Sequence, residues 1–294
     1  MTVKKAVIPV AGHGTRLLPA TKSQPKEMLP VGRKPVVQYV VEELEGSGLN
    51  QILFITGRKK RSIEDHFDKD VELLEELHRS GKSNLIEEMK YQELDVSFYY
   101  VRQSVQKGLA DAISLARDWV ADDDFVCSLG DSIIKGTQKG KSLMQRMMKV
   151  HTERKAACTL AIERVPQEDV YRYGIVEVKA EEDGGVFEVE SLVEKPNVEE
   201  ASSDLAIAAR YVFSPDIFKA IERTLPDRGG ELQITDSIQL LIKQGLPVYA
   251  VLLGEDEQRY DIGNYESYFK AFVDFALQDE KYGHMLRHYL ARKL

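Results

Sequence analysis

The sequence predicts an α/β fold with a Rossmann-like, mixed and mostly parallel central sheet flanked by helices, a β-rich extension and a C-terminal helical region. In the first half, apolar β-rich segments alternate with helical patterns, which is typical of parallel strands covered on both faces. In the second half, strand patterns follow one another with few helices between them. The final segment, residues 265–294, is amphipathic with helical spacing.

The expected elements follow from these patterns in chain order. We expect strands at 6–10, 51–56, 96–102 and 124–129, with helices at 36–45, 63–79 and 109–120 between them. Residues 68–93 are dense in charge and have apolar residues at helical spacing, which predicts an exposed helical excursion. The second half predicts strands at 156–165, 174–178, 186–193, 205–213 and 248–252, and helices at 216–223 and 232–244.

Composition excludes several classes of protein. The 40 Lys and Arg against 48 Asp and Glu give a net charge of −8, which argues against a nucleic-acid-binding surface. Cys127 and Cys158 both lie in predicted strands and do not suggest a disulfide scaffold, so we expect a reducing compartment. No apolar run approaches the roughly 20 residues of a membrane span. We therefore expect a cytoplasmic protein with neither nucleic acid nor membrane as a partner.

The loop after the first strand is the most informative segment of the chain. Its glycines, Gly12 and Gly14, let backbone N–H groups approach a phosphate without a Cβ in the way. Arg16, Lys22 and Lys26 follow within the same loop and supply positive charge. In a chain with net negative charge, this local concentration of cations predicts a site for a small polyphosphate.

Other interpretations of the glycine loops fit less well. A dinucleotide fingerprint needs a glycine where Leu17 stands. A P-loop near residues 136–142 has too few residues between its glycines, and Lys135 occupies the position of the first one. An ordinary tight turn explains the glycines but not the three cations among prolines.

At this point the sequence resembles the sugar-phosphate nucleotidylyltransferases. The matching motifs occur in family order from residue 5 to about 275. They are Gly12-x-Gly-Thr-Arg-Leu-Leu-Pro-Ala-Thr-Lys22, Pro25-Lys-Glu-Met-Leu-Pro30, Gln103 to Gly108, Gly130-Asp131, Tyr173-Gly174, Glu194-Lys195-Pro196, Gly230-Glu-Leu-Gln-Ile-Thr-Asp236 and Asp261-Ile-Gly263. The chain departs from the family pattern at His13, Ser23-Gln24 and Gly32-Arg33, which puts fine details of substrate preference in doubt.

The resemblance implies a reaction in which a sugar 1-phosphate oxygen attacks the α-phosphorus of a nucleoside triphosphate and pyrophosphate leaves. The variants Pro-Ala-Thr-Lys and Pro-Lys-Glu-Met-Leu-Pro favour UTP and glucose 1-phosphate. Because the nucleophile is already anionic, catalysis needs alignment and charge neutralisation rather than a general base. Thymidylyl transfer, a non-catalytic nucleotide-sugar sensor of the same fold, and an oxidoreductase remain alternatives.

The resemblance also implies roles for residues around the triphosphate. Arg16 and Lys26 are expected to clamp the phosphates as catalytic residues, with Lys195 as a third. Asp131 and Asp261 each follow a strand-like run and are expected to hold Mg²⁺. The backbone at the nucleotide is expected to come from Ala11, Gly12, Gly14 and Thr15.

The remaining expected contacts are to the base and the sugar. Gln103 offers one donor and one acceptor to the edge of uracil or thymine, although a freely rotating amide could adapt to cytosine. Gly108 is expected to let its loop lie along the base. The sugar phosphate is expected to contact Tyr173, Gly174, Glu194 and Lys195.

We expect one continuous domain over residues 1–294. Residues 1–135 form the expected nucleotide-binding half, 136–263 the sugar-phosphate-binding half, and 264–294 the C-terminal helices. The helical spacing of the aromatic residues in the last segment indicates core packing or a subunit contact. A homo-oligomer is therefore expected.

Overall fold

The computed structural model describes residues 3–137, 140–182 and 184–293. Within these residues a nine-stranded sheet has the order β5-β4-β1-β6-β11-β8-β12-β10-β9. The strands of the sheet are β1 (Lys5–Pro9), β4 (Gln51–Thr56), β5 (Ser97–Arg102), β6 (Phe125–Ser128), β8 (Cys158–Arg164), β9 (Gly174–Glu182), β10 (Val186–Glu194), β11 (Leu205–Phe213) and β12 (Val248–Leu252). The predicted α/β class and all the predicted strands are confirmed.

The sheet is mixed, and its two halves differ as the sequence pattern indicates. Strands β5, β4, β1 and β6 pair in parallel, as do β8 and β12. Strand β11 joins these two parallel groups through antiparallel pairs with β6 and β8, and β9 and β10 extend the sheet antiparallel. The carboxyl ends of β1, β4, β5 and β6 consequently lie at one edge, where open α/β sheets bind ligands.

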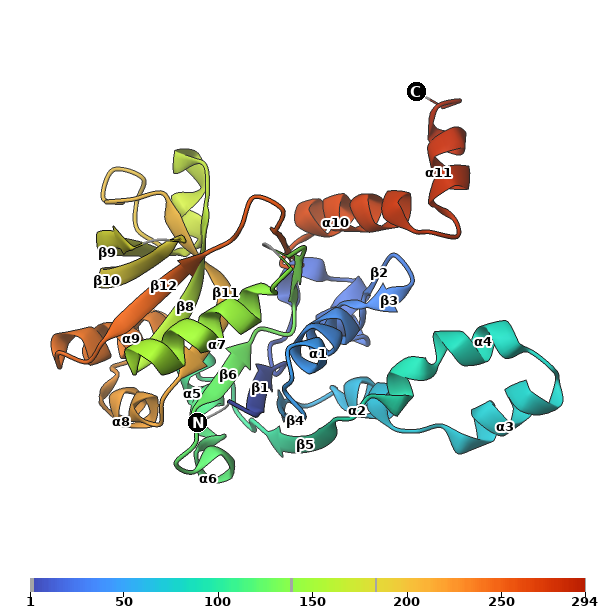
Figure 1. Ribbon diagram of the computed structural model, residues 1–294, viewed down its shortest axis with the longest axis horizontal. Helices are drawn as coiled ribbons and strands as arrows, with labels where there is room; N and C mark the ends of the chain where they lie inside the picture. Colours follow the sequence, from blue (N-terminus) through green and yellow to red (C-terminus); the bar gives the residue numbers. More distant parts are fainter. Residues whose placement is uncertain (1–2, 138–139, 183, 294) are drawn as a thin grey trace.

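Alternate residues of each central strand pack into opposite cores, because successive side chains of a strand point to opposite faces. Ala6 and Ile8 face a core with α1 (Val36–Gly46), α2 (Arg61–Phe67) and α7 (Leu143–Arg154). Val7 faces the other core, with α5 (Leu109–Ser114), α8 (Asp216–Arg223) and α9 (Ile234–Lys243). Helices therefore cover both faces of the sheet (Figure 1).

Two predicted helices are each broken in two. The segment 63–79 divides into α2 and α3 (Val71–Arg79) at Asp70, whose side chain caps α3. The segment 109–120 divides into α5 and α6 (Arg117–Val120). Apolar periodicity continues across these breaks, which is why it does not reveal them. The C-terminal segment forms helices, as expected: α10 (Tyr265–Gln278) and α11 (Gly283–Leu290).

The excursion is helical and projects from the body, as expected (Figure 1). It contains α3, α4 (Ser83–Glu88) and a 3-10 turn at Lys90–Glu93.

No described helix is long and apolar enough to cross a membrane. Cys127 and Cys158 are buried and free.

The sequence indicated a helix start near residue 142 but gave no bounds for helix α7, and it did not reveal two short ribbons. Helix α7 begins with a capping box at Ser142 and Gln145. One ribbon pairs β2 (Pro30–Val31) with β3 (Lys34–Pro35). The other pairs β7 (Ser132–Lys135) with β13 (Gln258–Asp261), placing Asp261 opposite Ser132. This pairing between distant segments brings the two predicted metal-binding aspartates together.

Burial of the α1 face gives a test of the core. Leu44 on α1 is fully buried, so Leu44→Ala leaves a cavity and should lower the free energy of unfolding by about 2–5 kcal/mol. Leu225 is 80% exposed, and Leu225→Ala should change stability by less than about 0.5 kcal/mol. Equilibrium denaturant unfolding measures both, and equal losses in the two variants would contradict this packing.

Candidate active site

The predicted nucleotide loop forms one wall of a cavity of 350 Å³ at the carboxyl edge of the sheet. Two glutamines, Gln103 and Gln106, line it beside Glu231. The predicted residues that meet in it are Ala11, Gly12, Arg16, Lys26, Gln103, Gly108 and Asp131. The backbone and cations of the loop after β1, the amide predicted to read the base and the carboxylate come from three separate segments, so only the fold assembles them.

Lys26 and Asp131 form an ion pair at the floor of this cavity. Burial alone would lower the pKa of Lys26, but the carboxylates of Asp131, Glu27 and Asp261 outweigh it and raise that pKa. Burial alone would raise the pKa of Asp131, but Lys26 outweighs it and lowers that pKa. Both groups are therefore charged at neutral pH.

Asp261 lies next to this pair. Ile262 N donates to Asp131 O at 2.9 Å, which fixes the two aspartate segments side by side. Burial, and then repulsion from Asp131, raise the pKa of Asp261, while Arg259, Lys26 and Arg16 oppose the rise. A divalent cation would relieve this repulsion, so the two carboxylates fit a metal.

The described residues contain no group of three or more His, Cys, Asp or Glu side chains able to hold a metal. Mg²⁺ is commonly bound by one or two carboxylates, with waters and substrate phosphates as its other ligands. Asp131 and Asp261 match that arrangement. A metal here would accordingly depend on phosphate oxygens from a bound substrate.

The turn that carries Asp131 is held by a buried arginine that the sequence reading did not identify. Arg210 is fully buried in β11 and makes a bidentate pair with Glu43 of α1, the shortest contact being 2.6 Å. Its Nη2 also donates to Ser132 O at 2.8 Å, and Ala209 O accepts from Leu129 N at 3.2 Å. The only hint of this role in the sequence is a single arginine within an otherwise apolar strand pattern.

The irregularity of β11 makes these contacts possible. Its register with β8 shifts between Ile207 and Tyr211, and Ala209 has a φ of 58°. Such bulges redirect side chains next to active sites. The bulge thus turns Arg210 and the carbonyl of Ala209 toward the Asp131 turn.

Gln103 has a defined orientation in the structure. Its side chain is 4% exposed, and its Nε2 donates to Asp111 Oδ2 at 2.7 Å. A carboxylate only accepts hydrogen bonds, so it selects the amide nitrogen and leaves the amide oxygen as the free end. The sequence alone left both orientations of this amide open. Asp111 is a residue that the sequence reading missed.

The packing of the chain around Gly108 requires a glycine at this position. It has a φ of 103°, and a Cβ would lie 2.5 Å from Leu232 O. Leu232 N donates to Lys107 O at 2.7 Å, so the Gly108 loop packs directly against the segment before α9. This contact accounts for the glycine, and a contact between Gly108 and a base stays a prediction.

The predicted sugar-phosphate residues gather around the end of β10. Glu194 lies opposite Gly174 in the ladder, and Lys195 N donates to Tyr173 O at 3.0 Å. A Cβ on Gly174 would meet Ile207 Cδ1 at 2.9 Å and Glu194 Oε2 at 3.1 Å, so glycine leaves room for both side chains. Thr235, which belongs to the Gly230–Asp236 motif but had no role assigned from the sequence, donates to Glu194 Oε2 at 2.7 Å.

Lys195 combines exposure with an unusual backbone. Its Nζ lies 3.0 Å from Glu194 Oε1, its side chain is 55% exposed and its φ is 45°. Non-glycine residues with positive φ are uncommon and cluster at functional sites. The geometry is consistent with a cation held ready beside the carboxylate.

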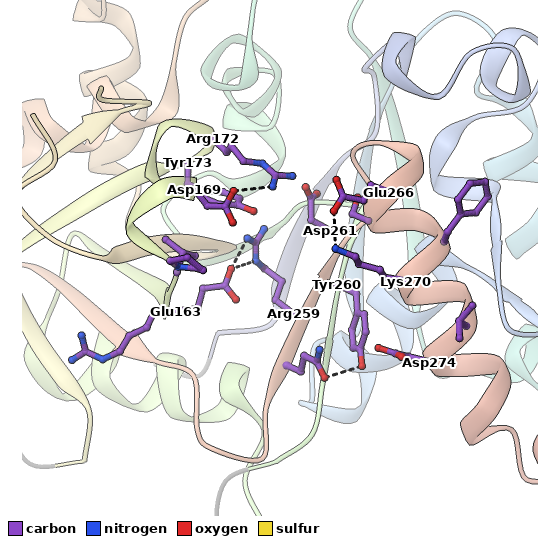
Figure 2. Close-up of a pocket in the computed structure, with 17 residues that line it drawn as sticks. Glu163, Asp169, Arg172, Tyr173, Arg259, Tyr260, Asp261, Glu266, Lys270 and Asp274 are labelled. Carbon is purple, nitrogen blue, oxygen red and sulfur yellow. Dashed lines mark hydrogen bonds and ion pairs between the residues drawn. The ribbon is translucent and has the colours of Figure 1, made fainter. Parts of the chain in front are cut away.

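A larger cavity of 700 Å³ lies between the β-rich half and α10 (Figure 2). Tyr173 and Asp261 line it with Arg259, whose Nε donates to Glu163 at 2.5 Å and whose guanidinium is 4.9 Å from the Tyr173 ring centroid. Arg259 therefore connects β13, which bears Asp261, to the β-rich half.

Two other predicted residues lie elsewhere. Thr15 lines a third cavity, and Gly14 begins the 3-10 turn Thr15–Leu17.

The chain is similar to known proteins over most of its length. A family model described as nucleotidyl transferase matches residues 5–278. A UTP–glucose-1-phosphate uridylyltransferase 1 from Staphylococcus saprophyticus is 42% identical over 280 residues, covering 95% of each chain.

Two solved structures are also similar along nearly the whole chain. A UTP-bound UGPase from Acinetobacter baumannii has a TM-score of 0.89 and 35% identity, covering 98% of this chain and 99% of that one. A UDP-glucose pyrophosphorylase complexed with UDP-glucose has a TM-score of 0.84 and 35% identity, covering 94% and 100%.

The electrostatics of Asp261 predict a pH effect. Arg259→Gln removes a positive charge that lowers the pKa of Asp261, so that pKa should rise further. Asp261 is then protonated at a higher pH, and the acid limb of kcat/KM should move upward in pH. Arg164→Gln is the control, because Arg164 lines the same cavity but is exposed and pairs with Asp204 at 2.8 Å. An identical acid limb in Arg259→Gln and the native chain would contradict this role.

Proposed function

The chain belongs to the nucleotidyl transferase family, and we propose that it transfers the uridylyl group of UTP to glucose 1-phosphate, giving UDP-glucose and pyrophosphate. The observation that carries this proposal is the cavity in which Arg16, Lys26 and Asp131 meet the oriented amide of Gln103. Phosphate-binding and base-reading groups lie in one place, as transfer from a nucleoside triphosphate requires.

In the proposed reaction, a phosphate oxygen of glucose 1-phosphate attacks the α-phosphorus. The protein has to align two anions and offset their repulsion. Arg16 and Lys26 bind the triphosphate, and Lys195 binds the sugar phosphate. Glu194, held by Thr235, accepts hydrogen bonds from sugar hydroxyls.

Enzymes of this family generally use a divalent metal, and we propose Mg²⁺ held by Asp131 and Asp261. The ion would offset the negative charge of the phosphates around the reacting phosphorus. Lys26 meanwhile keeps Asp131 ionised and in place through their ion pair. The nearby Arg259 opposes protonation of Asp261.

Two further expectations concern the chain as a whole. The central sheet contains strands from both proposed halves, which supports a single continuous domain.

Helices α10 and α11 lie away from the sheet (Figure 1) and carry three large apolar side chains that are each more than half exposed: Phe269, Met285 and Tyr289. A second copy of the chain covering these side chains would give the expected homo-oligomer.

A pyrophosphate-release assay over a grid of nucleoside triphosphates and sugar 1-phosphates tests the proposed function. We expect the highest kcat/KM with UTP and glucose 1-phosphate, and no release when Mg²⁺ is chelated. A preference for dTTP would instead support the thymidylyl alternative. Absence of release with every pair would refute nucleotidyl transfer.

The contact between Asp111 and Gln103 predicts how the base is selected. With the amide nitrogen held by Asp111, the free oxygen accepts N3–H of uracil, whereas N3 of cytosine offers no proton. In Asp111→Asn, the new side chain can either accept or donate a hydrogen bond. The Gln103 amide can then flip, so that its oxygen and nitrogen exchange places. The ratio of kcat/KM for UTP to that for CTP should fall by roughly tenfold, as for one lost hydrogen bond of about 1.4 kcal/mol.

Asp118→Asn is the matched control for this measurement, since Asp118 is exposed on α6 and loses the same charge. It should retain the native ratio. If Asp111→Asn also keeps the native ratio, another group reads the base.

A further inference from the structure

The C-terminal helix α11 carries an exposed apolar stripe. Tyr282, Met285 and Tyr289 are spaced three and four residues apart, so they lie on one side of the helix. Met285 is 59% exposed and Tyr289 is 56% exposed. Figure 1 shows α11 turned away from the sheet at the end of α10. The stripe is therefore open to a partner.

The segment that contains α11 is basic along its whole length. From residue 281 to the end of the chain, the sequence has no aspartate or glutamate. Its lysines and arginines are Lys281, Arg287, Arg292 and Lys293. The chain as a whole has a net charge of −8, so this segment differs from the rest of the surface and attracts acidic groups.

The helical excursion, residues 68–93, has the complementary character. Carboxylates outnumber lysines and arginines by two to one within it. Val71 and Leu73 of α3 are 53% and 40% exposed, and Leu85 of α4 is 47% exposed. Glu72 and Glu75 of α3 are exposed as well, and they form no ion pair with any residue that the structure describes. The excursion thus combines apolar side chains with unpaired negative charge.

Arg33 joins these two surfaces. It lies in the turn between β2 and β3, and its Nη1 donates to Glu88 Oε1 of α4 at 2.5 Å. Its Nε donates to Asp279 Oδ2 at 2.7 Å. Asp279 Oδ1 in turn accepts from Lys281 N and Tyr282 N, just before α11. One guanidinium, at a position where the chain departs from its family pattern, therefore connects the acidic excursion to the start of the basic helix.

The two surfaces together form a patch with an acidic half and a basic half. Both halves lie at the end of the molecule opposite strands β9 and β10 (Figure 1). Their apolar side chains stay exposed within one copy, so the group that covers them lies outside that copy. A two-fold rotation places each half of such a patch against the opposite half of a second copy.

We propose that α11 of one copy docks on the excursion of a second copy, reciprocally about a two-fold axis. The inference rests on the homo-oligomer proposed above and specifies which surfaces meet in it. Met285 and Tyr289 pack against the exposed apolar side chains of α3 and α4. Arg292 and Lys293 face the carboxylates of α3. Arg33 fixes the placement of both surfaces within each copy.

Reversal of charge tests this pairing. Arg292→Glu with Lys293→Glu makes the end of the chain acidic, and Glu72→Arg with Glu75→Arg makes α3 basic. Each double variant places like charges opposite one another in its own dimer, so we expect the dimer Kd to rise at least roughly tenfold. Sedimentation velocity over a dilution series measures this Kd.

A mixture of the two double variants gives the decisive measurement. In a mixed dimer, the acidic chain end of one variant meets the basic α3 of the other, and the second contact has its native charges. Both contacts again join opposite charges, so the Kd of the mixed dimer should return to near the native value.

Two controls separate this pairing from general effects of charge and apolar surface. Arg223→Glu with Lys243→Glu reverses two exposed cations on α8 and α9 and should keep the native Kd. Tyr289→Ser should raise the Kd, because aromatic side chains commonly dominate interfaces. Tyr171→Ser removes a tyrosine that is 54% exposed in the β-rich half and should not raise it. All substituted residues are exposed, and circular dichroism checks that each variant folds.

The remaining outcomes each overturn a defined statement. Native Kd values in both charge-reversed variants, or no recovery in their mixture, overturn the pairing of α11 with the excursion and leave the homo-oligomer in place. A monomeric native chain that sediments with vesicles of anionic lipid assigns the basic helix to a lipid surface instead. A native chain that is monomeric at every concentration overturns the homo-oligomer and this inference together, whereas the pyrophosphate-release assay decides the transfer reaction independently.

Discussion

The buried guanidinium of Arg210 is the constraint on which the site depends. A charge inside a protein is costly unless it is paired and hydrogen-bonded, and Arg210 meets that demand through Glu43 and the carbonyls of Ser132 and Ala209. These bonds hold the turn that bears Asp131 between β11 and α1. Ile262 N donates a hydrogen bond to the carbonyl of Asp131. The position of Asp261 therefore depends on the same contacts of Arg210.

Three ion pairs with buried members lie around this turn and the segments next to it. Lys60 pairs with Glu27, Lys26 with Asp131, and Arg259 with Glu163 beside Asp261. Lys26 and Asp131 keep each other ionised, as the lowered pKa of Asp131 and the raised pKa of Lys26 indicate. Burial raises the pKa of Glu27 against the opposing effect of Lys60 and Lys26. Burial and Asp131 raise the pKa of Asp261, and a bound divalent cation would offset that unfavourable charge.

Several glycines and polar residues have structural causes that differ from their expected roles. Gly108 is required by the approach of Leu232, and Gly174 leaves room for the side chains of Ile207 and Glu194. Gln103 is held by Asp111, so the orientation of the amide is a property of the folded chain. Local sequence identifies which residue types are present at a site, but not which neighbour uses each hydrogen-bonding group.

The sequence by itself determined the α/β class, the main strands and the family, and it located the loop proposed to bind phosphate, because these depend on local periodicity and short contiguous motifs. It could not locate the breaks in the helices, since apolar spacing continues across Asp70 and across residues 115–116. Only the tertiary structure decided that Asp131 and Asp261 lie together and that Arg210 holds the Asp131 turn. Both arrangements join segments far apart in the chain, through the pairing of β7 with β13 and the bulge in β11.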